Sequence, residues 1–260
     1  MALITLNTSP VVFTLYNSLA INSYGLFIAV GALIGYYLLE RDVVIKKIMS
    51  PEKLSSVAIF IIVTAVFGGR LLWCLENPDY LSNFFMFWHG GFSITGTIST
   101  VALLLPLYLK YKEHVSIVTF LDRLVIYAPL IQAISRIGCF LAGCCHGINT
   151  ALPWAVIYTN QACAAPTGLP IHATQLYSSL LLFIIFIGLY TQNHKVNKPG
   201  TLVAFYLIFA GAERFFVDFL RADRTLIMSN FSFIQAVSCG LIVTGFLWWY
   251  VVSYAYARQQ

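Results

Sequence analysis

Stretches of about 20 apolar residues recur along the whole chain, and this feature limits its fold more than any other. A helix of that length crosses the hydrocarbon core of a membrane. Only 10% of the 260 residues are charged, against about 25% in a typical soluble domain. Backbone groups in lipid must be paired internally, and no alternating strand pattern occurs, so the spans should be helices. The sequence therefore predicts an all-α polytopic membrane protein.

We expect one membrane-embedded domain over residues 1–260. The first 18 residues lack a basic segment and a cleavage site, so the first apolar stretch should be a span rather than a signal peptide. Lysine and arginine concentrate in alternate loops, and such loops mark the cytoplasmic side. The N-terminus should then lie outside and the C-terminus in the cytoplasm. The predicted spans are residues 19–39, 54–75, 91–109, 124–143, 173–191, 200–220 and 231–254.

The basic residues that lie outside these cytoplasmic segments are all arginines. They fall at the predicted outer ends of spans: Arg70, Arg136, Arg214, Arg221 and Arg224. A guanidinium grips phosphate with two parallel hydrogen bonds, and a charge within a span usually marks a site. Arg136 and Arg214 lie deepest, which makes them the main candidates for binding an anion. For Arg70 and Arg224, snorkelling toward lipid headgroups is an equal alternative.

Three outer segments carry further polar chemistry. Residues 88–96, "WHGGFSITG", place His89 before glycines that permit close approach of a ligand or of a neighbouring helix. Residues 172–177, "HATQLY", start a span, where a helix N-terminus favours anions. Residues 211–224 put Asp218 between Arg214 and Arg221 on one helical face, either to orient them for an anion or as an internal ion-pair network. His146 is the third histidine on this side.

In this order the motifs resemble those of the phosphatidylglycerol–prolipoprotein diacylglyceryl transferases of bacterial inner membranes. The resemblance covers nearly the whole chain, but Cys139 and Ala142 stand where the family has asparagines. The family often has glutamate at the position of Cys144, and it has glutamate at the positions of Ser178 and Asp218. The similar segments are Tyr24-Gly25-Leu26, "GGRL" 68–71, "HGGFSITG" 89–96, "RIGCFLAG" 136–143, "HATQLY" 172–177, "RFFVDFLR" 214–221 and "SFIQAVS" 232–238.

This resemblance implies that the diacylglyceryl group of phosphatidylglycerol is transferred to the thiol of a prolipoprotein lipobox cysteine, with release of glycerol phosphate. The site would face the outer leaflet of the bacterial inner membrane. Arg136 and Arg214 would hold the phosphate and His89 would act as the base. No metal, nucleotide or other cofactor is expected, and no nucleic acid partner. The substrate-binding residues would be Tyr24, Gly90, Gly91, Gly96, Gly138, Gly143, His172, Gln175, Tyr177, Asp218 and Arg221.

Two other functions remain open at this stage. One is a related transferase that moves a lipid or a headgroup onto another acceptor. The other is a non-catalytic lipid-binding protein or a transporter, although the paired broken helices and internal repeats of transporters are not evident in the sequence.

The segment "RIGCFLAGCCHG", residues 136–147, adds cysteines that the resemblance does not explain. Cys144 or Cys145 pairs with Cys163 in one interpretation, because the outer compartment is oxidising. In a second, the cysteines with His146 bind a metal, although the spacing matches no standard zinc pattern. In a third, one cysteine is a nucleophile activated by His146 or His89. Inert packing is the remaining alternative.

Overall fold

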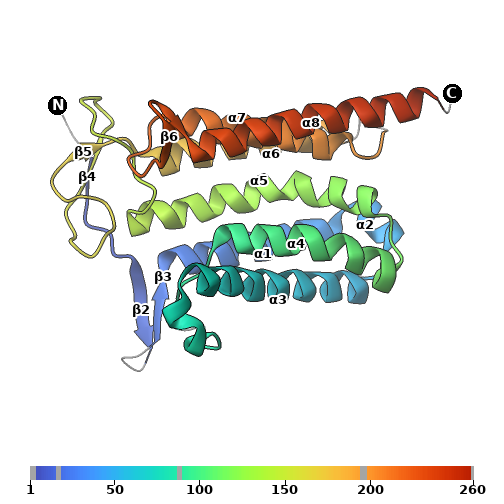
Figure 1. The fold of residues 1–260 in the computed structure, drawn as a ribbon, viewed down its shortest axis with the longest axis horizontal. Coiled ribbons are helices and arrows are strands. Elements are labelled where there is room, and N and C mark those ends of the chain that lie inside the picture. The colour runs from blue at the N-terminus through green and yellow to red at the C-terminus, as the bar shows by residue number, and fades with distance from the viewer. Residues whose placement is uncertain (1–3, 16–18, 87–89, 194–197, 259–260) are drawn as a thin grey trace. The chain divides into compact units, whose positions relative to one another are not determined.

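The computed structural model describes the chain except for residues 1–3, 16–18, 87–89, 194–197 and 259–260. The described part contains seven helices of at least 15 residues, and each overlaps one predicted span (Figure 1). The all-α polytopic architecture is therefore confirmed. These helices are α1 (Ser23–Arg41), α3 (Pro51–Glu76), α4 (Ile94–Tyr108), α5 (Ile117–Ala142), α6 (Thr174–Gln192), α7 (Thr201–Asp218) and α8 (Phe233–Ala257).

Six of the seven helices are long and apolar enough to cross a membrane, if α4 is counted with the π-helical turn η3 (Leu109–Glu113) that continues it. The exception among the described helices is α7. It has 18 residues, but its last turns carry Glu213, Arg214 and Asp218. Charges within a span are costly unless they serve a site, so α7 is the helix whose composition calls for a functional explanation.

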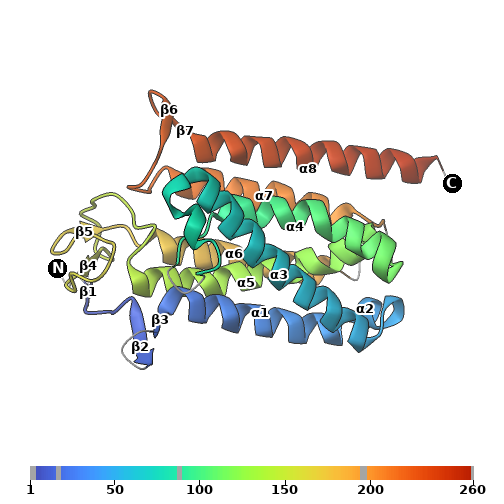
Figure 2. The ribbon, with the colours of Figure 1, turned by 60° about the horizontal axis from the view of Figure 1, so that its bottom comes forward.

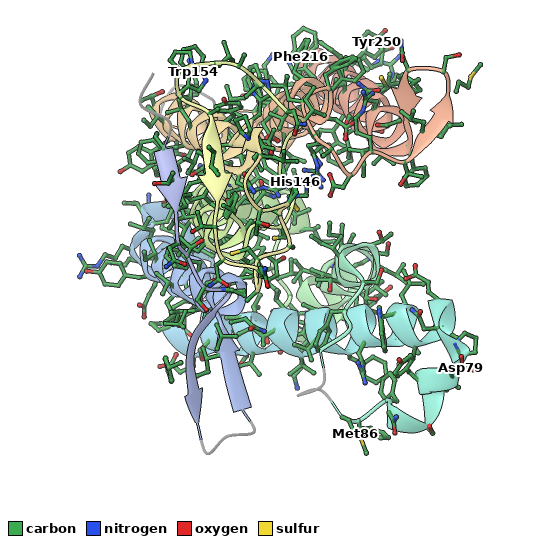
Figure 3. All side chains as sticks on the ribbon, turned by 90° about the vertical axis from the view of Figure 1, so that its left-hand side faces the viewer. Asp79, Met86, His146, Trp154, Phe216 and Tyr250 are labelled. Atoms are coloured by element: carbon green, nitrogen blue, oxygen red, sulfur yellow. The ribbon has the colours of Figure 1, made fainter. Side chains whose placement is uncertain are left out.

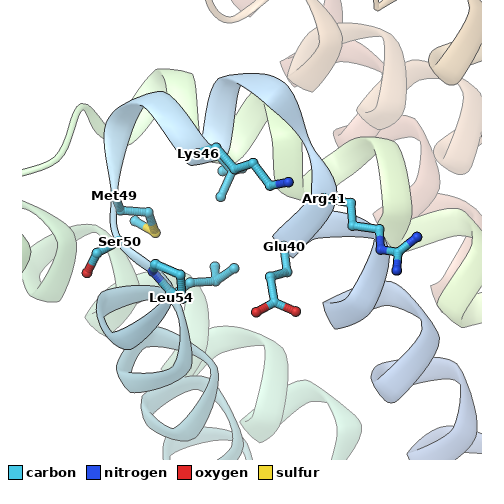
Figure 4. Close-up of a pocket in the computed structure, with 8 residues that line it drawn as sticks. Glu40, Arg41, Lys46, Met49, Ser50 and Leu54 are labelled. Atoms are coloured by element: carbon cyan, nitrogen blue, oxygen red, sulfur yellow. The ribbon is translucent and has the colours of Figure 1, made fainter.

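The helices fall into two compact units, one of residues 40–120 and the other of residues 1–39 and 121–260. In the unit of residues 40–120, Asp42 accepts hydrogen bonds from the amides of Val44 and Ile45, at 2.8 and 3.2 Å, and so caps the short helix α2 (Val43–Ile48). A cavity of about 330 Å³ lies at the turn between α2 and α3 (Figure 4), and no predicted site residue lines it.

Arg70 of α3 organises the segment that follows this helix, which includes the short 3-10 helix η1 (Pro78–Asn83). Arg70 is 1% exposed, and its guanidinium donates to the carbonyls of Asn83 at 2.7 Å and Phe84 at 3.1 Å. It also donates to the carbonyls of Met86, Gly90 and Gly91. Neither snorkelling nor anion binding describes this residue, because its donors serve the backbone of the segment.

In the other unit, glycines allow the helices to approach one another closely. A Cβ on Gly138 of α5 would lie 2.9 Å from the carbonyl oxygen of Ser23 at the start of α1. A Cβ on Gly211 of α7 would lie 3.0 Å from the carbonyl oxygen of Ser238 on α8. The helices α7 and α8 consequently run side by side (Figures 1 and 2). Small residues at such contacts are typical of membrane helices.

Short strands flank the helices of this unit, and the sequence analysis did not anticipate them. The strands β1 (Ile4–Leu6), β4 (Val156–Tyr158) and β5 (Pro170–Ile171) form one sheet in the order β1-β4-β5. Two hairpins pair β2 (Val11–Leu15) with β3 (Leu19–Asn22), and β6 (Leu226–Met228) with β7 (Phe231–Ser232). At two to five residues, these strands are too short to give a period-two pattern.

Tyr158 joins the sheet to the end of α5. Its hydroxyl donates to the carbonyl of Phe140 at 2.7 Å, and its ring packs in a cluster that includes Cys163 and Ile171. Burial raises the pKa of this phenol. The long connection between α5 and α6, residues 143–173, is therefore a folded layer over one end of these helices (Figure 1).

Candidate functional site

Three arginines face one small pocket at the end of α5, α6 and α7. Arg136 comes from the last turns of α5, Arg214 from α7, and Arg221 from the segment just after α7. All three were candidate site residues in the sequence, and the structure places them on one pocket. The other lining residues are Cys145, Thr174, Gln175, Ser178 and Val217.

Backbone pairing explains how these segments meet. The amide of Ile148 donates to the carbonyl of Leu220 at 2.9 Å, and the amide of Ala222 donates to the carbonyl of His146 at 3.1 Å. On the other side, the amide of Gly147 donates to the carbonyl of His172 at 3.0 Å. The segment after α5 is thus hydrogen-bonded both to the segment after α7 and to the segment before α6.

The arginines keep hydrogen-bonding capacity for a ligand. Within the described residues, the guanidinium groups of Arg136 and Arg214 form no hydrogen bond or ion pair. Arg221 donates through Nε and Nη2 to the carboxylate of Asp223, at 2.8 and 2.5 Å, while its buried Nη1 has no partner in the described chain. A buried donor is normally paired, so Nη1 of Arg221, beside the half-buried guanidinium groups of Arg136 and Arg214, favours a site for an acceptor-rich anion.

Asp223 keeps Arg221 in place without neutralising the pocket. Burial alone would raise the pKa of the Asp223 carboxyl, but the hydrogen bonds from Arg221 lower it below its ordinary value. Asp223 is therefore a carboxylate at neutral pH, and it holds one edge of the Arg221 guanidinium while the other edge remains available.

Gln175 adds an acceptor to the donors of the arginines. It is 1% exposed, and its side-chain amide nitrogen donates to the carbonyl of Cys144 at 2.7 Å. Its Oε1 has no partner within the described chain. A ligand that carries both a phosphate and a hydroxyl group would satisfy the arginines and Gln175 together.

Glu213 is the site residue that the sequence analysis missed. It is 8% exposed on α7, and its carboxylate accepts a hydrogen bond from the hydroxyl of the pocket residue Ser178 on α6. Arg136, Arg214 and Arg221 all act on it electrostatically. An acidic residue buried in an apolar helix was the available signal.

Asp218 has different partners from those expected. It is 1% exposed and accepts from the hydroxyl of Ser232 at 2.5 Å and from Nε of Arg224 at 3.2 Å. It is absent from the pocket lining, and the hydrogen-bonding partner of Arg221 is Asp223. The expectation that Asp218 orients Arg214 and Arg221 is wrong, because its carboxylate instead ties the end of α7 to the start of α8.

The expected histidines do not gather at the described pocket. His89 lies outside the described residues. His172 Nδ1 is 3.3 Å from the hydroxyl of Tyr177, which also accepts from Nε1 of Trp154 at 2.9 Å. His146 lies on the segment after α5 (Figure 3). His146, His172 and Tyr177 do not line the pocket, so direct ligand contact by His172 and Tyr177 stays a prediction.

The glycines predicted to bind substrate lie in turns or at close contacts between helices. Gly90, Gly91 and Gly143 adopt φ angles of 72°, 79° and 72°, which side chains rarely tolerate. A Cβ on Gly96 would lie 2.4 Å from the carbonyl oxygen of Gly68, and Gly138 packs as described above against α1. Turn formation and helix packing account for these positions, whether or not a ligand also approaches them.

The predicted disulfide is absent, since all six cysteines have free thiols. Cys163 Sγ lies 3.3 Å from the carbonyl oxygen of Thr8, within the sheet layer. The thiols of Cys144 and Cys145 instead turn toward Cys139, and the three Sγ atoms lie within 4.8 Å of one another. Pairing of Cys144 or Cys145 with Cys163 is therefore corrected to a cluster at the end of α5. Tyr24 of α1 interacts electrostatically with this cluster and with Arg136.

Comparison with known proteins gives a consistent result. A family model described as prolipoprotein diacylglyceryl transferase matches residues 10–251. The chain is 35% identical over 243 residues to the phosphatidylglycerol–prolipoprotein diacylglyceryl transferase of Clostridium tetani, covering 91% of this chain and 94% of that one. It is 34% identical over 240 residues to the enzyme of the same name from Fervidobacterium nodosum, with coverages of 88% and 81%. Transferase 2 of Clostridium perfringens is 30% identical over 237 residues, with coverages of 88% and 90%.

Proposed function

Because the chain belongs to the prolipoprotein diacylglyceryl transferase family, we propose that it transfers the diacylglyceryl group of phosphatidylglycerol to a prolipoprotein cysteine thiol. The chain is a multi-pass bacterial membrane protein. We place it in the inner membrane, with the Arg136–Arg221 end of its helices toward the outer leaflet. The observation that carries the proposal is the pocket of three arginines with free donors.

The charge of the pocket fits a phosphodiester. Arg136, Arg214 and Arg221 supply three positive charges against the two carboxyl groups of Glu213 and Asp223, so the pocket keeps a net positive charge. The phosphate of phosphatidylglycerol carries a single negative charge. The hydroxyl groups of its glycerol headgroup would suit the free Oε1 of Gln175.

The same groups would assist the reaction. The acceptor sulfur attacks the glycerol carbon that bears the phosphate, the S–C bond forms, and the C–O bond to phosphate breaks with its electron pair on oxygen. Negative charge grows on the departing glycerol phosphate, and the arginines stabilise it. The acceptor thiol must lose its proton to solvent or to a base, since its ordinary pKa is about 8.5. His89 remains our candidate for that base.

Purified enzyme in lipid nanodiscs tests this function with phosphatidylglycerol labelled in its acyl chains and a peptide containing a lipobox cysteine. We expect labelled peptide and free glycerol phosphate in equal amounts. Arg136→Ala and Arg214→Ala should each reduce turnover by about 100- to 1000-fold. Label transfer to a different acceptor would support the related-transferase alternative, and lipid binding without transfer to any acceptor would overturn the proposal.

A further inference from the structure

Three cysteine thiols meet where α5 ends. Cys139 is 3% exposed on the last turns of α5, and Cys144 and Cys145 follow the helix and are half-buried. Their Sγ atoms lie within 4.8 Å of one another. Sulfur atoms around a tetrahedral zinc ion, each about 2.3 Å from the metal, are separated by about 3.8 Å. Small side-chain rotations would therefore bring all three sulfurs to bonding distance.

The backbone holds this arrangement in place. Gly143 and Cys145 both adopt left-handed conformations, with φ angles of 72° and 58°, and so turn the chain back toward Cys139. The carbonyl of Cys145 accepts from the hydroxyl of Thr174 at 2.8 Å, and that of Cys144 accepts from Gln175 at 2.7 Å. These hydrogen bonds fix the backbone from which the Cys144 and Cys145 side chains project.

The cluster adjoins the arginine pocket. Cys145 lines that pocket together with Arg136 and Arg221, and both arginines act on its sulfur electrostatically. Three thiolates with one divalent zinc ion carry a net charge of −1, which neighbouring guanidinium groups stabilise. Three protein ligands also leave the fourth position of zinc open, as in catalytic rather than structural zinc sites.

We propose that Cys139, Cys144 and Cys145 bind a zinc ion whose fourth ligand is the sulfur of the acceptor cysteine. This inference rests on the proposed function. A thiol that binds zinc gives up its proton, which passes to solvent. The metal-bound thiolate then attacks the glycerol carbon, the C–O bond breaks toward the phosphate, and the thioether product leaves the metal. Zinc would thus supply the activated nucleophile beside the arginines that hold the leaving group.

The test uses the full-length protein purified under reducing conditions, as wild type and as Cys139→Ser, Cys144→Ser and Cys145→Ser variants. Cys239→Ser is the matched control, because Cys239 is exposed on α8. Elemental analysis should find about one zinc ion per chain in the wild type and the control. Cadmium titration should produce a thiolate charge-transfer band in these two proteins, and each cluster variant should lose affinity by more than about 100-fold.

Turnover provides the second readout. Stripping the wild type with a chelator should abolish transfer to the lipobox peptide, and added zinc should restore it. The half-buried Cys145 gives the deciding variant, because serine is tolerated more easily there than at the buried position 139. Full turnover without metal would overturn the zinc inference and leave the transferase function intact. Zinc held by the cysteines without any lipid transfer would overturn both its catalytic role and the proposed function.

Discussion

Ser178 on α6 donates its hydroxyl hydrogen bond to the buried carboxylate of Glu213 on α7. The contact brings a negative charge to the edge of a pocket that is otherwise lined by three arginines. The motif resemblance implies a glutamate at the position that Ser178 occupies here. The neighbouring helix thus supplies the carboxylate that position 178 lacks, and it reaches the pocket through the serine hydroxyl.

Glu213→Gln should keep the hydrogen bond to Ser178 while removing the charge. The pocket then holds phosphatidylglycerol and glycerol phosphate more tightly. Tighter binding of the lipid should lower its KM, and tighter binding of glycerol phosphate should lower kcat. We expect each to fall by about 3- to 10-fold, since a change of about 1 kcal/mol in binding free energy alters an equilibrium roughly fivefold.

The check is steady-state kinetics over a range of phosphatidylglycerol in nanodiscs. Asp79→Asn is the control, because Asp79 is exposed and lies in the unit of residues 40–120 (Figure 3). A purely structural role for Glu213 would lower thermal stability and leave KM unchanged, and a KM that rises would contradict the charge argument.

Arg136→Lys and Arg214→Lys should recover little of the activity that alanine removes. Lysine keeps the charge but lacks the planar pair of donors that meets two phosphate oxygens at once. We expect each lysine variant to stay at least about 30-fold below wild type in kcat/KM. Arg258→Lys, an exposed change at the end of α8, should be neutral. Wild-type kinetics in either pocket variant would show that charge alone suffices there.

The sequence predicted the helices and singled out the arginines that line the pocket, because both depend on local signals. Apolar stretches fix the spans, and arginines at the outer ends of successive spans must converge if those helices pack together. The partners of individual side chains were less predictable. Asp218 was assigned to Arg214 and Arg221 from helical spacing, whereas the chain after α7 folds back and presents Arg224 to it instead.

The layer formed by residues 143–173 shows a second limit of sequence analysis. Its strands pair residues far apart in the chain, such as Ile4 with Val156, and two- or three-residue strands carry no periodicity. The cysteine cluster was equally hidden. The spacing of Cys139, Cys144 and Cys145 resembles no standard zinc motif, and only the left-handed turn at residues 143–145 brings the sulfurs together.

Asp218→Asn should destabilise the fold more than it impairs the chemistry. Asp218 is 1% exposed, and its loss leaves Arg224 without its carboxylate partner. Breaking such a pair costs about 3–5 kcal/mol when it is fully buried, and less here because the Arg224 side chain is 18% exposed. We expect Tm in detergent to fall by several degrees. Asp223→Asn is the comparison for stability, since the half-exposed Asp223 should contribute only about 0–1 kcal/mol. An unchanged Tm for Asp218→Asn would show that Ser232 and Arg224 do not depend on this carboxylate.

The seven-span topology depends on α7, whose last turns carry Glu213, Arg214 and Asp218. If α7 crosses the membrane, the chain crosses seven times and its ends lie on opposite sides; if it does not, the six other helices return the C-terminus to the side of the N-terminus. The basic residues Lys195, Lys198 and Arg258 favour seven crossings, because all three then lie on the cytoplasmic side.

A reporter enzyme that is active only outside the cytoplasm should therefore be inactive when fused after Gln260 and active when fused after Asn160. Activity at both positions would leave six spans and place α7 along the membrane surface. Activity at Gln260 alone would turn the arginine pocket toward the cytoplasm and contradict the proposed outer-leaflet site.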